Sequence, residues 1–127
     1  MAENFKTFKN KYLQKIMINA AIIGLGWWGK TIVNAVQGKS EKIRFVHGVS
    51  HEPDSVRDYA KEKSFTLSNT LEPALADPQV QMVWLATPHS THRKLVEQAA
   101  AAGKAVFCEK PFALKFADAL ARVDACK

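Results

Sequence analysis

The most constraining feature of the sequence is a glycine-rich octet that directly follows an apolar run. Residues 24–31 read Gly-Leu-Gly-Trp-Trp-Gly-Lys-Thr, and the run before them spans residues 16–23. The octet matches two phosphate-binding patterns, the G-x-G-x-x-G of a dinucleotide-binding turn and the G-x-x-x-x-G-K-[ST] of a P-loop. Both patterns join a strand to a helix whose N-terminal N–H groups and dipole favour an anion. The octet therefore predicts an α/β fold with a phosphate site at this turn.

The two patterns assign different roles to the same residues. In the dinucleotide interpretation, Gly24 makes the tight turn, Gly26 leaves room for a pyrophosphate and Gly29 lets the helix pack on the strand. In the P-loop interpretation, Lys30 reaches the β and γ phosphates and Thr31 holds magnesium. A glycine-rich turn that binds no ligand is the remaining alternative.

We favour the dinucleotide interpretation for three reasons. No acidic residue closes the second or the fourth predicted strand, where a P-loop protein usually holds magnesium. Trp27 and Trp28 are bulky for a loop that must wrap a triphosphate, although they are tolerable at the start of a helix. Finally, the spacing to the second strand suits a βαβ unit of about 30 residues.

Strands and helices alternate along the rest of the chain. We expect strands at 16–23, 43–49, 64–67, 80–86 and 105–108, and helices at 28–37, 53–63, 69–77, 91–102 and 116–126. This alternation, with continuous apolar strands, is typical of a parallel sheet covered by helices on both faces. We interpret residues 17–127 as one such domain. Residues 1–16 form an extension with aromatic residues at helical spacing, which predicts a short amphipathic helix.

Polar or glycine-containing segments follow four of the predicted strands. These segments are residues 24–29, 50–51, 87–92 and 109–111. The carboxyl ends of parallel strands meet at one edge of the sheet, and open α/β sheets bind their ligands there. We therefore expect the four segments to form a single site.

Composition and charge weigh against several other classes of protein. The chain has 127 residues, of which 47% are hydrophobic, and so we expect a folded domain with a core. The net charge of +6 raises nucleic acid as a partner, but the basic residues are spread along the chain, which favours a solvated surface. No apolar run is long enough for a membrane span, and no secretory signal is visible. Cys108 and Cys126 lack metal-binding spacing, which favours a reduced cytoplasmic protein.

Several residues of the predicted site have plain alternative roles. His89 and His92 lie three residues apart at a predicted helix start, but no Cys or acidic residue accompanies them, and we expect no metal site. Trp27 and Trp28 are expected to pack at the helix start, or one of them to shield the pyrophosphate turn. Cys108 is expected to be a small buried residue and not a nucleophile.

Three segments resemble the Gfo/Idh/MocA family, which is typified by glucose–fructose oxidoreductase and inositol dehydrogenase. They read AIIGLGWWG at residues 21–29, ATPHSTH at residues 86–92 and AGKAVFCEKP at residues 102–111. The resemblance covers residues 17–127. It implies a Rossmann-type, doubly wound parallel sheet that binds NAD or NADP. It further implies an oxidoreductase that transfers hydride to or from a sugar, cyclitol or related alcohol.

The resemblance also implies individual roles. It places the three glycines around the pyrophosphate and the Thr87–His92 loop beside the cofactor. It makes Lys110 the catalytic lysine, whose ammonium polarises a developing alkoxide, while Pro111 fixes the backbone after it. The complete set of expected cofactor-binding residues is Gly24, Gly26, Trp27, Trp28, Gly29, Ser50, His51, Thr87, Pro88, His89, His92, Glu109, Lys110 and Pro111.

The residues after the second strand bear on the choice of cofactor. An NAD site usually has an acidic residue there, which binds the ribose 2′-OH. This chain has Ser50 and His51 instead, so that a 2′-phosphate is not repelled, and His51 or Arg57 can supply positive charge. We therefore expect NADP to be preferred over NAD, although Glu52, one residue further on, argues for NAD.

The sequence ends before the part in which family members bind their substrate. The resemblance implies a C-terminal α/β domain that carries the remaining catalytic residues, so we expect this truncated chain to bind a cofactor without turnover. A non-catalytic NAD(P)-binding or regulatory module is the alternative. The strand at residues 105–108 would then be an unpaired edge beside an apolar last helix. This predicts a homo-oligomer.

Overall fold

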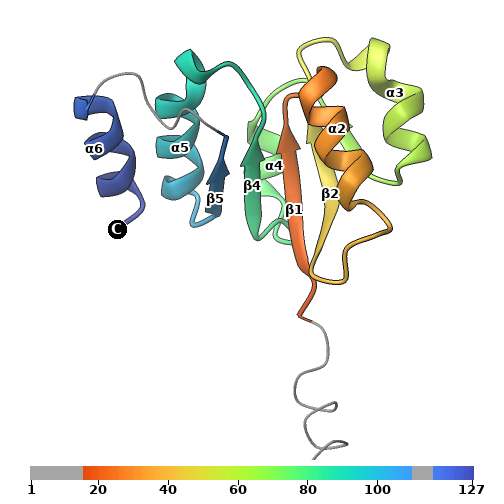
Figure 1. Cartoon of the computed structure of the whole chain (residues 1–127), viewed down its shortest axis with the longest axis horizontal. Coiled ribbons are helices and arrows are strands. Elements are labelled where there is room, and N and C mark those ends of the chain that lie inside the picture. The colour runs from red at the N-terminus through yellow and green to blue at the C-terminus, as the bar shows by residue number, and fades with distance from the viewer. Residues whose placement is uncertain (1–15, 110–115) are drawn as a thin grey trace, which may run out of the picture.

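A computed structural model describes residues 16–109 and 116–127 as a five-stranded sheet with helices on both faces (Figure 1). The expected alternation and fold class are confirmed. The predicted helix within residues 1–15 lies outside the described residues. In chain order the elements are β1 (Ile18–Ile23), α2 (Trp27–Val36), β2 (Ile43–Val49), α3 (Pro53–Glu62), β3 (Thr66–Ser68), α4 (Glu72–Ala76), β4 (Met82–Leu85), the 3₁₀ turn η1 (His89–Thr91), α5 (His92–Ala101), β5 (Ala105–Cys108) and α6 (Phe116–Ala125).

α4 begins three residues later than expected, and β3 and β4 each begin two residues later; the last two differences occur at turns. β4 begins two residues later than expected because the N–H of Val80 bonds to the carbonyl of Asp77 and closes a turn there. β3 begins at Thr66 and not at Ser64, since Ser64 takes a left-handed φ of 62° as the chain leaves α3. In both cases a local turn replaces the first residues of an apolar run.

All the strand pairs are parallel, and the strand order is β3-β2-β1-β4-β5. The chain proceeds outward from β1 to β3, then returns to the other side of β1 to form β4 and β5. The order of the strands therefore reverses between β1 and β4. Ligands of open α/β sheets bind beyond the carboxyl ends of the strands at this point of reversal.

The sheet separates two hydrophobic cores, and β1 contributes to both. Ala20 and Ile22 pack with residues of α2 and α3, while Ala21 and Ile23 pack with residues of α4 and α5. All four side chains are buried. This two-sided burial explains why the first strand reads as a continuous apolar run and not as an alternating one.

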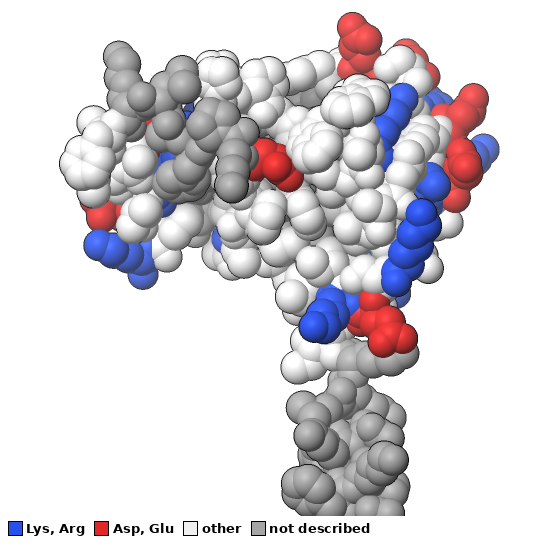
Figure 2. Space-filling view, in the orientation of Figure 1, with Lys and Arg blue, Asp and Glu red and all other residues white. Residues whose placement is uncertain are grey.

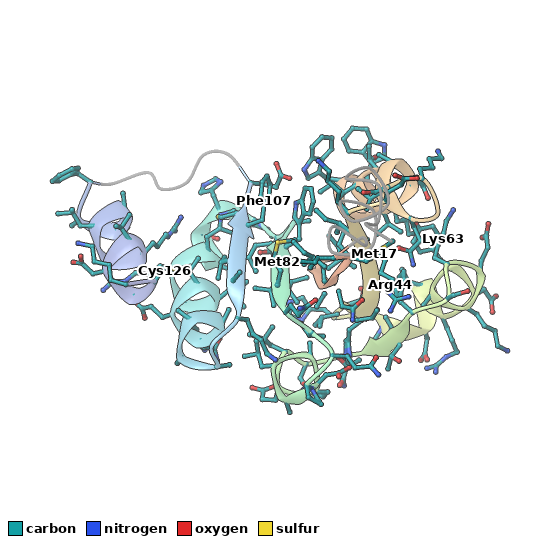
Figure 3. The ribbon with its side chains drawn as sticks, turned by 90° about the horizontal axis from the view of Figure 1, so that it is seen from below. Met17, Arg44, Lys63, Met82, Phe107 and Cys126 are labelled. Carbon is teal, nitrogen blue, oxygen red and sulfur yellow. The ribbon has the colours of Figure 1, made fainter. Side chains whose placement is uncertain are left out.

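The α2 side of the sheet is less completely covered over β4 and β5. Met82 and Trp84 of β4 face this side, and the ring centroid of Phe107 on β5 lies 4.3 Å from that of Trp84 (Figure 3). Figure 2 shows this face, on which charged side chains gather toward α2 and α3 and the middle is largely uncharged. Within residues 16–109 and 116–127, none of the helices combines the length and the apolar character that a membrane crossing requires.

Candidate nucleotide-binding site

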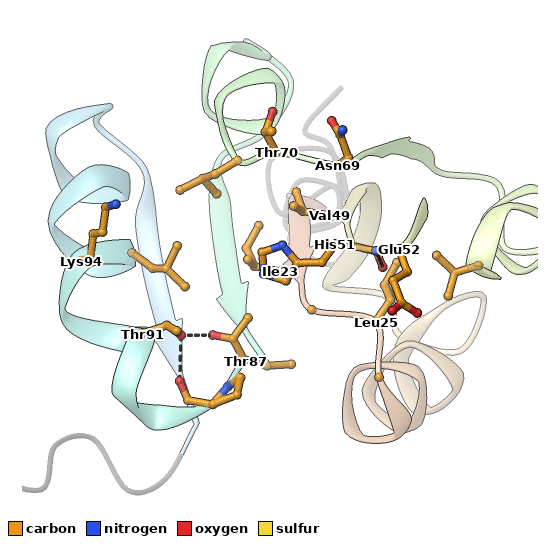
Figure 4. Close-up of a pocket in the computed structure, with 18 of the residues that line it drawn as sticks. Ile23, Leu25, Val49, His51, Glu52, Asn69, Thr70, Thr87, Thr91 and Lys94 are labelled. Atoms are coloured by element: carbon orange, nitrogen blue, oxygen red, sulfur yellow. Dashed lines mark hydrogen bonds between the residues drawn. The ribbon is translucent and has the colours of Figure 1, made fainter. Parts of the chain in front are cut away.

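A cavity of about 960 Å³ lies along the carboxyl ends of the strands (Figure 4), at the upper end of the range for small-molecule and cofactor sites. Its walls come from the turn after β1, the segment after β2, the segment after β3, and the Ala86–Gln98 region after β4. Three of the four segments expected from the sequence therefore meet in one cavity. Of the expected residues, those that line it are Gly24, Gly26, Ser50, His51, Thr87 and Pro88.

Two of the three glycines are required by the fold itself. Gly24 has a φ of 98°, and a Cβ at this position would lie 2.9 Å from the carbonyl oxygen of Ala86. A Cβ at Gly29 would lie 1.9 Å from the carbonyl oxygen of Gly24. Gly24 thus packs the turn against the end of β4, and Gly29 packs the first turn of α2 against the glycine turn.

Gly26 is different because nothing in the protein requires a glycine there. Its backbone is extended, with a φ of −74°, and a Cβ would meet no protein atom within 4 Å. Gly26 lines the cavity and is the N-cap of α2, whose first turn has neither a side-chain cap nor an acidic residue. The open space before Gly26 and the uncapped N–H groups fit a pyrophosphate.

The segment after β2 brings polar and charged side chains to the same cavity. The Ser50 hydroxyl accepts a hydrogen bond from the N–H of Glu52 at 3.2 Å, and both residues line the cavity with the exposed His51. Arg57, an expected source of positive charge, instead pairs with Asp54 on the surface of α3 and is absent from the cavity lining. The lysines among the cavity-lining residues are Lys30 of α2 and Lys94 of α5.

The loop after β4 is held by its own hydroxyl groups. The Thr91 hydroxyl donates to the Pro88 carbonyl at 2.7 Å, and its oxygen lies 2.9 Å from the hydroxyl oxygen of Thr87 (Figure 4). A Cβ at Gly24 would lie 3.0 Å from Cγ2 of Thr87, so this loop also packs on the glycine turn. The loop is therefore fixed against the place where a dinucleotide would pass.

His92 lies behind this loop and does not line the cavity. Its side chain is buried, and its Nε2 lies 2.7 Å from the Thr87 carbonyl oxygen, which can only accept, so Nε2 carries the proton. Nδ1 therefore accepts the thiol proton of Cys108, whose Sγ is 3.0 Å away. Burial lowers the pKa of His92 and raises the pKa of the Cys108 thiol, which keeps both groups neutral.

This arrangement gives His92 a supporting position, since it links the end of β5 to the loop after β4. Cys108 is half-buried and hydrogen-bonded, and so it is more than the small buried residue expected from the sequence. The next residue, Glu109, accepts a hydrogen bond from the Trp84 indole N–H at 2.9 Å. The two residues that precede Lys110 are thus both anchored by side-chain hydrogen bonds.

The remaining expected residues lie away from the cavity or outside the described residues. Trp27 is 80% exposed and Trp28 is partly exposed, and neither lines the cavity. His89 is exposed, and its carbonyl accepts a hydrogen bond from Arg122. Lys110 and Pro111 lie in the segment that the structure does not describe. Across residues 16–109 and 116–127, no three His, Cys, Asp or Glu side chains come together as a metal site would need.

Sequence reasoning missed part of the cavity wall. Asn69 and Thr70 follow the short strand β3, which is a fifth strand end at the same edge of the sheet. Lys94, Leu95 and Gln98 continue the cavity wall from Thr91 along one face of α5, as the spacing of three to four residues allows. The same rule of strand ends and helix faces would have identified both groups.

Comparison with known proteins agrees with this geometry. Residues 18–127 match the model of the GFO_IDH_MocA family, an oxidoreductase family with an NAD-binding Rossmann fold. An uncharacterized oxidoreductase of Streptococcus pneumoniae is 32% identical over 111 residues, which are 87% of this chain and 29% of that protein. D-apiose dehydrogenase of Paraburkholderia graminis is 43% identical over 79 residues, which are 60% of this chain and 21% of that protein.

A solved structure of an oxidoreductase also matches this chain. A crystal structure from Desulfitobacterium hafniense, described as that of an NADPH-dependent oxidoreductase, matches with a TM-score of 0.79 and 30% identity. The match covers 86% of this chain and 31% of that one. The chain thus spans less than a third of the length of each of these three proteins.

Proposed function

Because the chain belongs to the Gfo/Idh/MocA family of oxidoreductases, we propose that it is the cofactor-binding part of a dehydrogenase. The enzyme would transfer hydride between a nicotinamide dinucleotide and a sugar, cyclitol or related alcohol. The observation that carries the proposal is Gly26, a cavity-lining glycine that the protein's own packing does not require. A glycine in such a place is explained by a ligand that approaches the backbone closely.

Each wall of the cavity has a part in this proposal. The uncapped first turn of α2 would hold the pyrophosphate before Gly26, and Ser50 and His51 would face the adenosine ribose. Thr87 and Pro88 would face the nicotinamide half. When bound, the nicotinamide supplies the group that donates or accepts the hydride. The chain's own part is to bind and orient that group.

We propose Lys110 as the catalytic residue of the enzyme. It follows Cys108 and Glu109, whose side chains are fixed by His92 and Trp84, so the chain enters this segment from an anchored strand end. An ammonium at the reacting hydroxyl would stabilise the alkoxide that develops as hydride leaves the carbon. The matched part of this chain is less than a third of the length of these relatives. We therefore expect the 127-residue chain alone to bind cofactor without turnover.

Within this function, we propose a preference for NADP over NAD. The residue directly after β2 is Ser50 and not an acid, and His51 and Lys30 line the same cavity. The carboxylate of Glu52 also lines it and is the opposing observation. Ser50, His51 and Lys30 can each donate to a 2′-phosphate, and among residues 50–52 only Glu52 carries a carboxylate that opposes it.

Calorimetric titration of the chain with NADPH, NADH and Mg-ATP tests the proposal. We expect both dinucleotides to bind and Mg-ATP not to bind. In the Gly26→Ala variant the added methyl group meets no protein atom, so the melting temperature should fall by no more than the small cost of alanine at an N-cap. Dinucleotide affinity should fall by about tenfold or more, a loss of about 1.4 kcal/mol. Binding of Mg-ATP alone, or full dinucleotide affinity in Gly26→Ala, would contradict the proposal.

A further inference from the structure

The dinucleotide interpretation assigns roles to the three glycines of the octet but none to Lys30. Lys30 is the lysine of the P-loop match, yet Thr31 beside it does not face a metal site. The Thr31 hydroxyl donates to the carbonyl of Trp27 at 2.8 Å, within its own helix. The position of Lys30 therefore needs an explanation other than a P-loop.

Lys30 lines the same cavity as the residues at the end of β2, and its side chain extends toward Tyr59 of α3, the helix that follows them. It lies in the first turn of α2, is half-buried and lines the cavity together with Ser50, His51 and Glu52. In the described part of the chain, Lys30 forms no ion pair. No carboxylate of residues 16–109 and 116–127 therefore neutralises its positive charge.

The ammonium of Lys30 is held by an aromatic ring. Its Nζ lies 5.3 Å from the ring centroid of Tyr59, close enough for a cation–π contact. The Tyr59 hydroxyl lies 2.7 Å from Oδ1 of Asn34 and 3.1 Å from the Lys30 carbonyl oxygen, so the ring is tied to α2. The lysine side chain is thus supported by a fixed surface and does not extend freely into solvent.

We propose that Lys30 determines cofactor specificity by binding the 2′-phosphate of NADP. The inference rests on the proposed function, because the phosphate belongs to the adenosine ribose that would lie at the end of β2. An ammonium suits a phosphate as a compact point charge, and the 2′-phosphate is the group that NADPH has and NADH lacks. Lys30 also offsets the carboxylate of Glu52, which lines the same cavity and would otherwise repel that phosphate.

The chain contains a matched control for this proposal. Lys63 is also half-buried and also places its Nζ over the Tyr59 ring, 5.8 Å from the centroid, but it is absent from the cavity lining. The Lys30→Met and Lys63→Met variants therefore remove the same charge from the same ring. Only the first removes it from the cavity.

The experiment is calorimetric titration of the wild type and both variants with NADPH and NADH, at low and moderate salt. We expect Lys30→Met to lower NADPH affinity by about ten- to thirtyfold, as for a charged hydrogen bond, and to leave NADH affinity within about twofold. Lys63→Met should leave both affinities unchanged. The salt dependence of NADPH binding should become weaker in Lys30→Met alone, since one phosphate contact is lost.

A smaller ligand pair and a conservative variant complete the test. 2′,5′-ADP and 5′-AMP differ by the same phosphate, and Lys30→Met should abolish the advantage of the first. Lys30→Arg should retain most of it. An equal loss of NADPH and NADH affinity would place Lys30 at the shared pyrophosphate and overturn the inference, as would no loss at all. If the wild type binds neither dinucleotide, the proposed function fails first, and the inference fails with it.

Discussion

At the residue scale, the choice between the two cofactors is expected to depend on Ser50. The Ser50→Asp variant places a carboxylate directly after β2, where it repels a 2′-phosphate and accepts a hydrogen bond from a 2′-hydroxyl. We expect NADPH affinity to fall by about tenfold or more while NADH affinity is retained or improved. Dissociation constants for both cofactors from fluorescence titration would measure the change.

Ser90 provides the control for this substitution. It lines the same cavity from the turn after β4, and in the strand order β4 lies on the other side of β1 from β2, which Ser50 follows. The Ser90→Asp variant therefore adds the same charge to the cavity without placing it at the ribose, and should alter NADPH and NADH affinities in parallel. An unchanged affinity ratio in Ser50→Asp would mean that this position does not face the ribose.

Two buried histidines predict how stability changes with pH. Burial lowers the pKa of His47 and of His92 from 6.5, although Asp77 partly opposes the shift at His47. Below pH 6.5 the unfolded chain binds protons that the folded chain does not, so their contribution is fully present above this pH and is lost as the pH falls. Each histidine contributes a slope of at most about 1.4 kcal/mol per pH unit.

Urea unfolding between pH 5 and pH 8 would measure this effect. The free energy of unfolding should be nearly flat above pH 7 and should fall below pH 6.5. His92→Gln, which removes one of the two buried imidazoles, should reduce the slope. A stability that rises on acidification through this range would show that the two buried side chains are not held neutral.

At the element scale, substitutions in the glycine turn distinguish a glycine needed for packing α2, Gly29, from a glycine needed for binding, Gly26. In Gly29→Ala, the new Cβ would lie 1.9 Å from the carbonyl oxygen of Gly24, so α2 must move away from the turn. We expect a loss of stability of about 1–3 kcal/mol, as for other overpacked buried sites, together with weaker binding. Thermal melting would show this loss in Gly29→Ala and a much smaller one in Gly26→Ala. Equal melting temperatures would contradict the packing role of Gly29.

Most of the elements could be predicted from sequence because their signals are local. The apolar runs of β1 and β2 and the glycine turn before α2 each identify an element within a few residues. The cavity was predictable to the extent that strand ends converge, which brings Gly24, Ser50 and Thr87 together. These inferences need only the alternation of elements and the rule that parallel strands end at one edge.

The other parts of the site depend on contacts that no short pattern contains. The hydrogen bond between Cys108 and His92 joins β5 to α5, and the position of Lys30 over the Tyr59 ring joins α2 to α3. The exposure of the Trp27 side chain depends on which residue begins α2, because the helix start fixes the side on which each side chain lies. Each requires the packing of two elements in three dimensions, which the hydrophobic pattern alone does not specify.

At the scale of the whole molecule, the two edges of the sheet differ in what they expose. β3 and β5 are the edge strands, and in the described part of the chain no strand pairs with the outer edge of either. No residue of β3 is a large exposed hydrophobic, whereas Phe107 of β5 is 46% exposed and stacks on Trp84. An unpaired edge with apolar side chains is a template for pairing with another chain.

We therefore predict that the 127-residue chain self-associates through β5. Leu120 and Val123 of α6 are also exposed and extend the apolar surface beyond the strand. A lysine on an edge strand opposes such pairing, so Phe107→Lys should shift sedimentation velocity profiles from a dimer or larger species toward monomer. Trp27→Lys removes a more exposed aromatic side chain from α2 and should leave the association unchanged. If Trp27→Lys and Phe107→Lys both shift the chain to monomer, association is driven by exposed aromatic surface in general and not by the β5 edge. If the wild type is monomeric at every concentration, the edge argument fails.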